Sequence, residues 1–160
     1  MTIQAGDKLP EATFKVMTAN GPEDLTRDGL CAGKTVVIFA LPGAFTPTCS
    51  AKHLPGFIDK AAELRDKGVD SIACLSVNDA FVMGAWGKDK GAGDDVIMLA
   101  DGNADFTKAL GLELDASGFG MGIRSQRYAM VVKDGVVTTL NVEAPGAFEV
   151  SSAEAILAAL

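Results

Sequence analysis

Residues that bind metals are scarce in this chain. It contains one histidine, His53, and three cysteines, Cys31, Cys49 and Cys74, among 160 residues. The cysteines are widely spaced and form no Cys-x-x-Cys pair. A structural zinc site needs four ligands, so we expect no metal site. The odd number of cysteines disfavours a secreted disulfide scaffold and suits a reducing compartment in which one thiol is reactive.

Long apolar runs and an excess of basic residues are also missing. The longest apolar stretch, 35–41, is far shorter than the roughly 20 residues that cross a bilayer. The first residues have neither the basic region nor the apolar core of a secretory signal, so we expect a cytoplasmic protein. The net charge of −7 argues against nucleic acid and membrane surfaces as partners. No repeat or linker divides the chain, and we expect one domain over 1–160.

What the sequence does contain is an alternation of strand-like and helix-like segments. Apolar, β-rich runs predict strands at 12–17, 25–26, 35–41, 69–77, 96–100, 127–133 and 136–142. Apolar residues at helical spacing predict helices after 50, 79, 103 and 152. Alternation implies parallel strands, and the final hairpin adds antiparallel ones. We therefore expect an α/β fold with a central mixed β-sheet and helices on both faces.

The stretch from Pro42 to Ser50, PGAFTPTCS, joins a predicted buried strand to a predicted helix. Thr46 is suited to the N-cap and Pro47 to the first helical position, which places Cys49 in the first turn. There, free backbone N–H groups and the helix dipole favour a thiolate. The alternative is a buried, inert thiol that packs like a small apolar residue. We interpret Cys49 as the reactive centre.

This stretch resembles the active-site loop of the peroxiredoxins, whose pattern Pro-x-x-x-Thr-x-x-Cys is met by Pro42, Thr46 and Cys49. The fuller form, with GAF before Thr46 and HLPGF from His53, resembles the type II (atypical, peroxiredoxin-5-like) subfamily. Further matches follow in order at 74–79, 81–87, 100–102, 111–115 and 124–128. The similarity covers nearly the whole chain and implies a thioredoxin-like fold.

The resemblance implies a thiol peroxidase that needs no metal, haem or flavin cofactor. Cys49 would be the peroxidatic cysteine, which attacks a hydroperoxide and becomes a sulfenic acid. Thr46 would bond the peroxide oxygen and the thiolate, and Pro42 would shield the cysteine from solvent. The arginine of the family falls on Arg127, whose fork could hold both peroxide oxygens. From the sequence alone Arg124 is equally plausible, with support of the loop or a dimer contact as its other role.

Two questions remain: whether His53 supports the reactive cysteine, and whether another cysteine of this chain reduces it after oxidation. His53, four residues after Cys49, is a supporting donor, which we prefer, a general base, or a helix histidine whose hydrogen bonds are made within the fold. Some relatives carry a resolving cysteine near the C-terminus, but 146–152 has none here, and Ser151 looks like an N-cap. Cys74 matches a second cysteine of plant-like members, yet its apolar strand favours a buried thiol. Cys31 matches nothing in the pattern.

We therefore predict a one-Cys cycle. Glutathione with glutaredoxin, or else thioredoxin, would reduce the sulfenic acid. The resemblance also implies a homodimer, with 43–46 and the helix that carries Phe81 as its contact. A non-catalytic peroxide sensor or holdase is the rival from another class. A thiol–disulfide oxidoreductase is the nearest enzymatic rival, and the lack of a Cys-x-x-Cys pair weakens it.

Overall fold

The computed structural model of the protein describes residues 2–160 and is built around a seven-stranded sheet in the order β2-β1-β5-β4-β3-β8-β9. The strands are β1 Thr13–Thr18, β2 Gly21–Thr26, β3 Thr35–Ala40, β4 Ser71–Ser76, β5 Ile97–Ala100, β8 Tyr128–Lys133 and β9 Val136–Val142. The inner strands β3, β4 and β5 are parallel, and the other pairs are antiparallel. The mixed sheet agrees with the prediction.

Strand β3 lies inside the sheet and is buried on both faces, as its uninterrupted apolar sequence predicts. Val37 and Phe39 face one core cluster, and Val36 and Ile38 face the other. This alternation follows from the two-residue period of a strand. Because β3 is fixed on both faces and both edges, the loop that leaves its carboxyl end starts from a rigid position.

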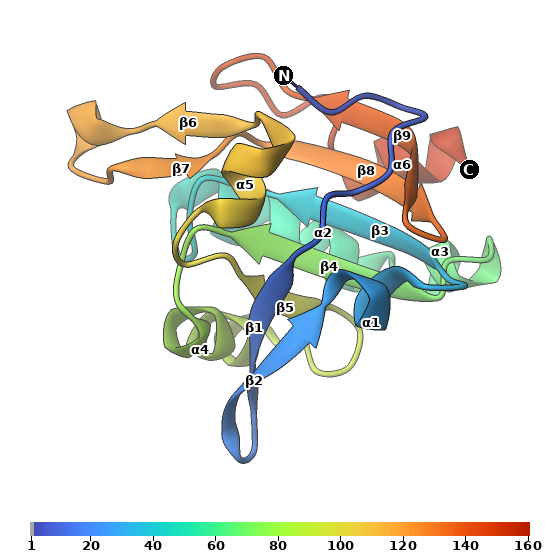
Figure 1. Cartoon of the computed structure of the whole chain (residues 1–160), viewed down its shortest axis with the longest axis horizontal. Helices are drawn as coiled ribbons and strands as arrows, with labels where there is room; N and C mark the ends of the chain where they lie inside the picture. The colour runs from blue at the N-terminus through green and yellow to red at the C-terminus, as the bar shows by residue number, and fades with distance from the viewer. Residues whose placement is uncertain (1) are drawn as a thin grey trace.

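Helices cover both faces of the sheet, which confirms the predicted fold class (Figure 1). One core cluster contains residues of α2, α3, α4 and α6, and the other contains residues of α1 and α5. The bounds are α1 Arg27–Cys31, α2 Leu54–Asp59, α3 Ala61–Asp66, α4 Ala80–Lys90, α5 Asp105–Leu110 and α6 Ala153–Ala159. Within residues 2–160, none of the helices has the length and apolar character needed to span a bilayer.

The structure corrects several local predictions. The single helix expected after residue 50 is divided into a π-helix at Cys49–His53 followed by α2 and α3. Pro47 is helical, as expected, but the Thr46 hydroxyl donates to the Gly43 carbonyl and does not cap the helix. At the start of α6, Ser152 rather than Ser151 accepts the capping N–H, from Ala155.

Two elements were not predicted from the sequence. Helix α1 is short and begins where the Thr26 hydroxyl accepts the N–H of Gly29. A small antiparallel hairpin, β6 Glu113–Asp115 and β7 Ile123–Ser125, extends from the body of the molecule, and the 3₁₀ turn η2, Ser117–Phe119, lies in its connection (Figure 1). Both strands have three residues, too few for a period to be recognised.

Candidate active site

The loop after β3 is held by the carboxyl end of β4. The Asn78 side-chain oxygen accepts the backbone N–H of Ala44 at 2.9 Å and the hydroxyl of Ser76 at 2.7 Å. Because β3 and β4 are parallel neighbours, their carboxyl ends meet at one edge of the sheet. The loop is thus tied to the next strand before the helix begins. Asn78 therefore holds the loop, while its neighbour Asp79 caps α4 by accepting the N–H of Val82.

Cys49 is fully buried at the start of the π-helix. The N–H of Leu54 donates to the Cys49 carbonyl, five residues back, which widens this turn compared with an α-helix. The following residue, Ser50, accepts the indole N–H of Trp86 at 2.9 Å. Cys49 is therefore fixed from the helix on one side and from α4 on the other.

Arg127 lies just before β8 and points its guanidinium at the thiol. Its Nη2 donates to Cys49 Sγ at 3.1 Å, and its Nη1 donates to His53 Nδ1 at 2.9 Å. A guanidinium remains charged at any working pH, so Arg127 presents a positive charge to the sulfur. The structure thus brings together Cys49, His53 and Arg127, residues that are up to 78 positions apart in the sequence.

His53 is a neutral imidazole with a defined tautomer. Arg127 has donors only, so Nδ1 must accept, and Nε2–H then donates to the Ser151 carbonyl at 2.9 Å. Burial, together with the positive charge of Arg127, lowers the pKa of His53 from 6.5 to about 3, against the opposing effects of the Ser151 carbonyl and Glu143. His53 therefore links Arg127 to the chain near Ser151 and carries no charge.

Thr46 and Pro42 lie in the loop that leads from β3 to Cys49. The Thr46 hydroxyl donates to the Gly43 carbonyl at 2.7 Å, which leaves its oxygen lone pairs available as acceptors. The recorded partner is thus Gly43 and not Cys49. Both side chains are only partly buried, so part of each is open to solvent.

Arg124 lies in β7 and contacts the loop rather than the thiol. Its Nε donates to the Met121 carbonyl at 3.0 Å and its Nη1 to the Pro42 carbonyl at 3.4 Å. The same Nη1 lies 3.0 Å from the position that a Cβ on Gly43 would occupy. The geometry therefore distinguishes the two arginines that the sequence left open: Arg127 reaches the thiol and Arg124 supports the loop.

The other cysteines are buried inside the fold. Cys74 lies in β4 between Phe39 and Met98 on the neighbouring strands and is not exposed at all. Burial raises the pKa of Cys74 well above its usual value, the nearby Cys49 raises it further, and Arg127 opposes both. Burial likewise raises the pKa of Cys31, to about 11. All three cysteines are free thiols.

Sequence reasoning missed the residues that surround His53 and Arg127 from the last loop. Phe148 packs edge-on against the His53 ring, with centroids 5.1 Å apart, and lies 5.9 Å from the Arg127 guanidinium carbon. Glu143, buried at the end of β9, binds the backbone of 149–151. No local pattern marks either residue, because Phe148 packs on the distant His53, and Glu143 binds Ser151, whose carbonyl is the partner of His53 across 98 positions of sequence.

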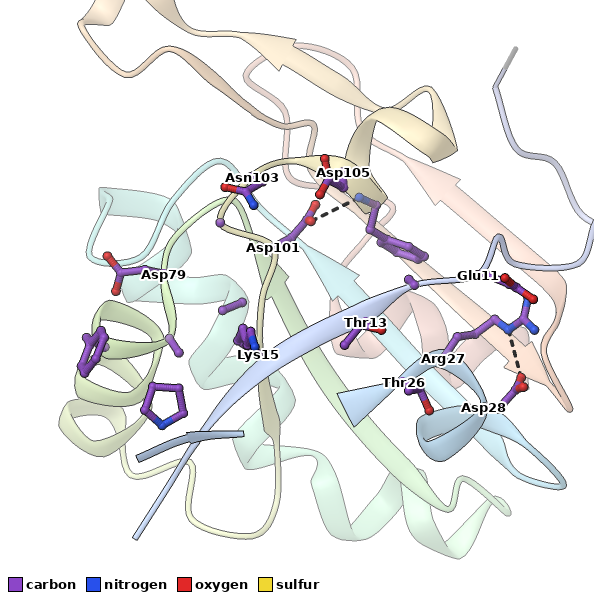
Figure 2. A pocket seen from close by; sticks show the side chains of 17 residues that line it. Glu11, Thr13, Lys15, Thr26, Arg27, Asp28, Asp79, Asp101, Asn103 and Asp105 are labelled. Carbon is purple, nitrogen blue, oxygen red and sulfur yellow. Dashed lines mark hydrogen bonds and ion pairs between the residues drawn. The ribbon is translucent and has the colours of Figure 1, made fainter. Parts of the chain in front are cut away.

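A cavity of about 900 Å³ lies away from Cys49, between the residues around β1 and the β5–α5 connection (Figure 2). Two of its charged side chains, Arg27 and Asp101, have partners within the fold. Arg27 donates to Asp28 and to the Leu9 carbonyl, and Asp101 accepts from the backbone N–H groups of Phe106 and Thr107. None of the predicted site residues lines it. In the part of the chain that the structure describes, no three His, Cys, Asp or Glu side chains gather to hold a metal ion.

Comparison with known proteins agrees with this arrangement. The Redoxin family profile matches residues 4–157. Peroxiredoxin-2E-2, chloroplastic, of Oryza sativa subsp. japonica is 58% identical over 164 residues, covering 99% of this chain and 73% of that protein. That name applies to the plant protein, and the cytoplasmic location expected for this chain stays a prediction.

Solved structures give the same result. Reduced Prx3 from Vibrio vulnificus in complex with H₂O₂ has a TM-score of 0.95 and 60% identity over 99% of both chains. Peroxiredoxin 5 from Alvinella pompejana has a TM-score of 0.85 and 32% identity, covering 98% of this chain and 96% of the other. With a family profile over nearly its whole length and relatives at these identities, the chain belongs to the peroxiredoxins, in their type II, peroxiredoxin-5-like group.

Proposed function

We propose that this peroxiredoxin reduces hydrogen peroxide and small alkyl hydroperoxides at Cys49 in a one-Cys cycle. The observation that carries the proposal is the contact of the Arg127 guanidinium with the Cys49 sulfur, 3.1 Å away, in a buried site. The complex of the Vibrio vulnificus relative with H₂O₂ supports the choice of substrate. The burial of Cys49 favours small hydroperoxides, because a bulky one would have to displace the residues that cover the thiol.

In the oxidative step, the Cys49 thiolate attacks the terminal oxygen of the hydroperoxide. An S–O bond forms and the O–O bond breaks, so the sulfur is oxidised to a sulfenic acid. The displaced alkoxide or hydroxide takes a proton from solvent and leaves as alcohol or water. Arg127 stabilises the negative charge as it moves to the leaving oxygen. The free lone pairs of Thr46 accept the peroxide O–H and orient the substrate.

The reductive step uses a thiol from outside the chain. Glutathione attacks the sulfenic acid, water leaves, and a mixed disulfide between glutathione and Cys49 remains. Glutaredoxin then reduces this disulfide and releases the Cys49 thiol. Thioredoxin is the second candidate for the reductant. The burial and raised pKa of Cys74 support this external route, because a resolving cysteine must reach the sulfenic acid as a thiolate.

We also propose that the protein works as a homodimer through the active-site loop and α4. Phe45 and Phe81 are 53% and 68% exposed, high values for aromatic side chains. Phe45 also has a left-handed backbone, with φ 64°, which is strained for a residue other than glycine. The strained backbone of Phe45 and its exposed ring beside Trp86 suggest a contact surface for a second copy.

A coupled assay tests the cycle. The protein is mixed with hydrogen peroxide, glutathione, glutaredoxin, glutathione reductase and NADPH, and a parallel reaction contains thioredoxin and its reductase. We expect steady NADPH consumption that Cys49→Ser abolishes. Turnover with thioredoxin alone would replace the proposed reductant but leave the peroxidase reaction in place.

The same assay separates the rivals. A peroxide sensor or holdase would take up one equivalent of peroxide and show no turnover with any thiol donor. A thiol–disulfide oxidoreductase would reduce disulfide substrates without peroxide. The structure weakens the second rival, because Cys74, the nearest other thiol candidate, lies within an interior strand.

A further inference from the structure

We propose that Glu143 is a positioning residue for the peroxide reaction, which acts on Cys49 through Ser151, His53 and Arg127. The proposal rests on the proposed function only in taking Cys49 as the reacting thiol. Glu143 is 8% exposed and lies directly after β9. Its backbone N–H donates to the Arg127 carbonyl at 2.9 Å, so the two residues extend the β8–β9 ladder side by side.

The carboxylate of Glu143 collects four donors from the loop that follows it. The N–H groups of Glu149, Val150 and Ser151 lie 2.8–3.0 Å from its oxygens, and the Ser151 hydroxyl lies 2.6 Å from Oε2. These bonds lower the pKa of Glu143 even though burial opposes them. A buried carboxylate is costly unless hydrogen-bond donors compensate it, and these four donors all come from the loop after β9. The carboxylate therefore fixes the backbone of 149–151.

A fixed Ser151 carbonyl determines which nitrogen of His53 carries the proton. Nε2–H donates to this carbonyl, which leaves Nδ1 unprotonated and able to accept from Arg127. In the other tautomer, an Nδ1–H would face an Arg127 N–H, and the guanidinium would have to move away from the Cys49 sulfur. Partners that orient a functional histidine in this way commonly change activity when they are removed.

The same loop places Phe148 against His53 and Arg127. Release of the loop would therefore loosen the imidazole and guanidinium together. Glu143 touches neither Cys49 nor any reacting atom, so its effect passes through these neighbours. This distinguishes its role from those of Thr46 and Arg127.

The test is Glu143→Gln, with Glu149→Gln as the matched control, because the Glu149 side chain is exposed in the same loop. An amide has one oxygen, and its NH₂ group would face an N–H donor. His53 is the only histidine, so ¹⁵N-histidine labelling gives a single imidazole spectrum that reports the tautomer. The second measurement is the single-turnover rate of the reduced protein with hydrogen peroxide, without any reductant.

We expect wild type and Glu149→Gln to show protonated Nε2 and unprotonated Nδ1. In Glu143→Gln the two nitrogen signals should move toward each other as both tautomers become populated, and the single-turnover rate should fall about tenfold. Unchanged nitrogen shifts in a folded Glu143→Gln protein, whatever its rate, would overturn the proposal. If that variant does not fold, Ser151→Ala removes one of the donors, and we expect the same changes at smaller size. Unchanged shifts in Ser151→Ala would equally overturn it.

A failure of the proposed function gives a different result. If Cys49 were not the reacting thiol, Cys49→Ser would retain the single-turnover reaction, and the histidine spectra would still report the effect of Glu143 on the tautomer. The two proposals can therefore fail separately.

Discussion

Arg127 places one guanidinium nitrogen 3.1 Å from the sulfur of Cys49, while its other terminal nitrogen is held by His53. One terminal nitrogen of the guanidinium therefore positions the group, and the other contacts the reacting sulfur. Lysine has the same charge but a single nitrogen, which cannot reproduce this planar arrangement.

We expect Arg127→Lys to lower the single-turnover rate with hydrogen peroxide by roughly 100-fold, the effect typical of losing one donor to a developing oxyanion. Arg124→Lys is the matched control and should have a much smaller effect, because Arg124 reaches only backbone carbonyls. Stopped-flow fluorescence of Trp86, the single tryptophan, can follow the reaction, since its indole N–H binds Ser50 next to Cys49. Equal losses in the two variants would contradict the assignment.

Asn78 and its neighbour Asp79 provide a second comparison. Asn78→Ala leaves the Ala44 N–H without its acceptor, which should cost about 1–3 kcal/mol of unfolding free energy and lower the peroxide rate as the loop loosens. Asp79→Ala removes the N-cap of α4 and should cost about 1 kcal/mol with little change in rate. Urea unfolding and single-turnover rates measure both effects. A rate loss of the same size in both variants would show that general destabilisation, and not the loop, is responsible.

The neutral state of His53 predicts a pH-dependent stability. The folded pKa of about 3 lies below the ordinary value of 6.5, so the unfolded chain binds a proton first as the pH falls. Stability due to the neutral imidazole is therefore complete above pH 6.5 and is lost as the pH falls toward 3. Between pH 7 and 5 the loss should be about 2 kcal/mol, since each pH unit contributes roughly 1.4 kcal/mol.

Urea unfolding at several pH values measures this loss. His53→Gln has no titrating group and should show a flatter profile between pH 7 and 5, because the carboxylates titrate mainly below this range. The same slope in wild type and His53→Gln would exclude His53 as the source.

The sequence was sufficient for the fold class and for the loop, because both depend on local patterns. The strand at 35–41 is apolar throughout, and Pro42, Thr46 and Cys49 lie within eight residues of one another. The contact of Arg127 with Cys49 could be predicted only from the family resemblance, which placed that residue near the thiol. From the residues alone Arg124 was equally plausible, and only the turn between β7 and β8 separates the directions in which the two side chains point.

What the sequence could not predict is the arrangement around His53. Glu143 and Ser151 are distant from it along the chain, and Ser151 was interpreted as a helix cap. Likewise, the π-helix at Cys49 has no recognisable pattern, because a helix with one extra residue in a turn differs too little in its apolar spacing. Roles defined by long-range hydrogen bonds require coordinates.

Cys74 provides a test of the one-Cys cycle. Cys74→Ala should leave turnover with glutathione and glutaredoxin unchanged, because the thiol is buried in β4 and its raised pKa disfavours the thiolate. Mass spectrometry after one equivalent of peroxide and glutathione should find a glutathione adduct on Cys49 only. A disulfide between Cys49 and Cys74 would instead mean that the active-site helix opens to let the two sulfurs meet.

The proposed dimer makes the last prediction. Phe81 is exposed on α4, the helix whose Trp86 ring lies 6.3 Å from the Phe45 ring, so Phe81→Glu would place a charge in an apolar contact if the two copies meet there. We expect wild type to sediment as a dimer and Phe81→Glu as a monomer at the same micromolar concentration. The single-turnover rate of the variant with peroxide should stay close to the wild-type rate. Leu160→Glu is the control, because Leu160 is also exposed, at 37%, but lies at the end of the chain after α6. A dimer that survives Phe81→Glu and dissociates in Leu160→Glu would move the contact to the opposite part of the molecule, and the strain at Phe45 would then need another explanation.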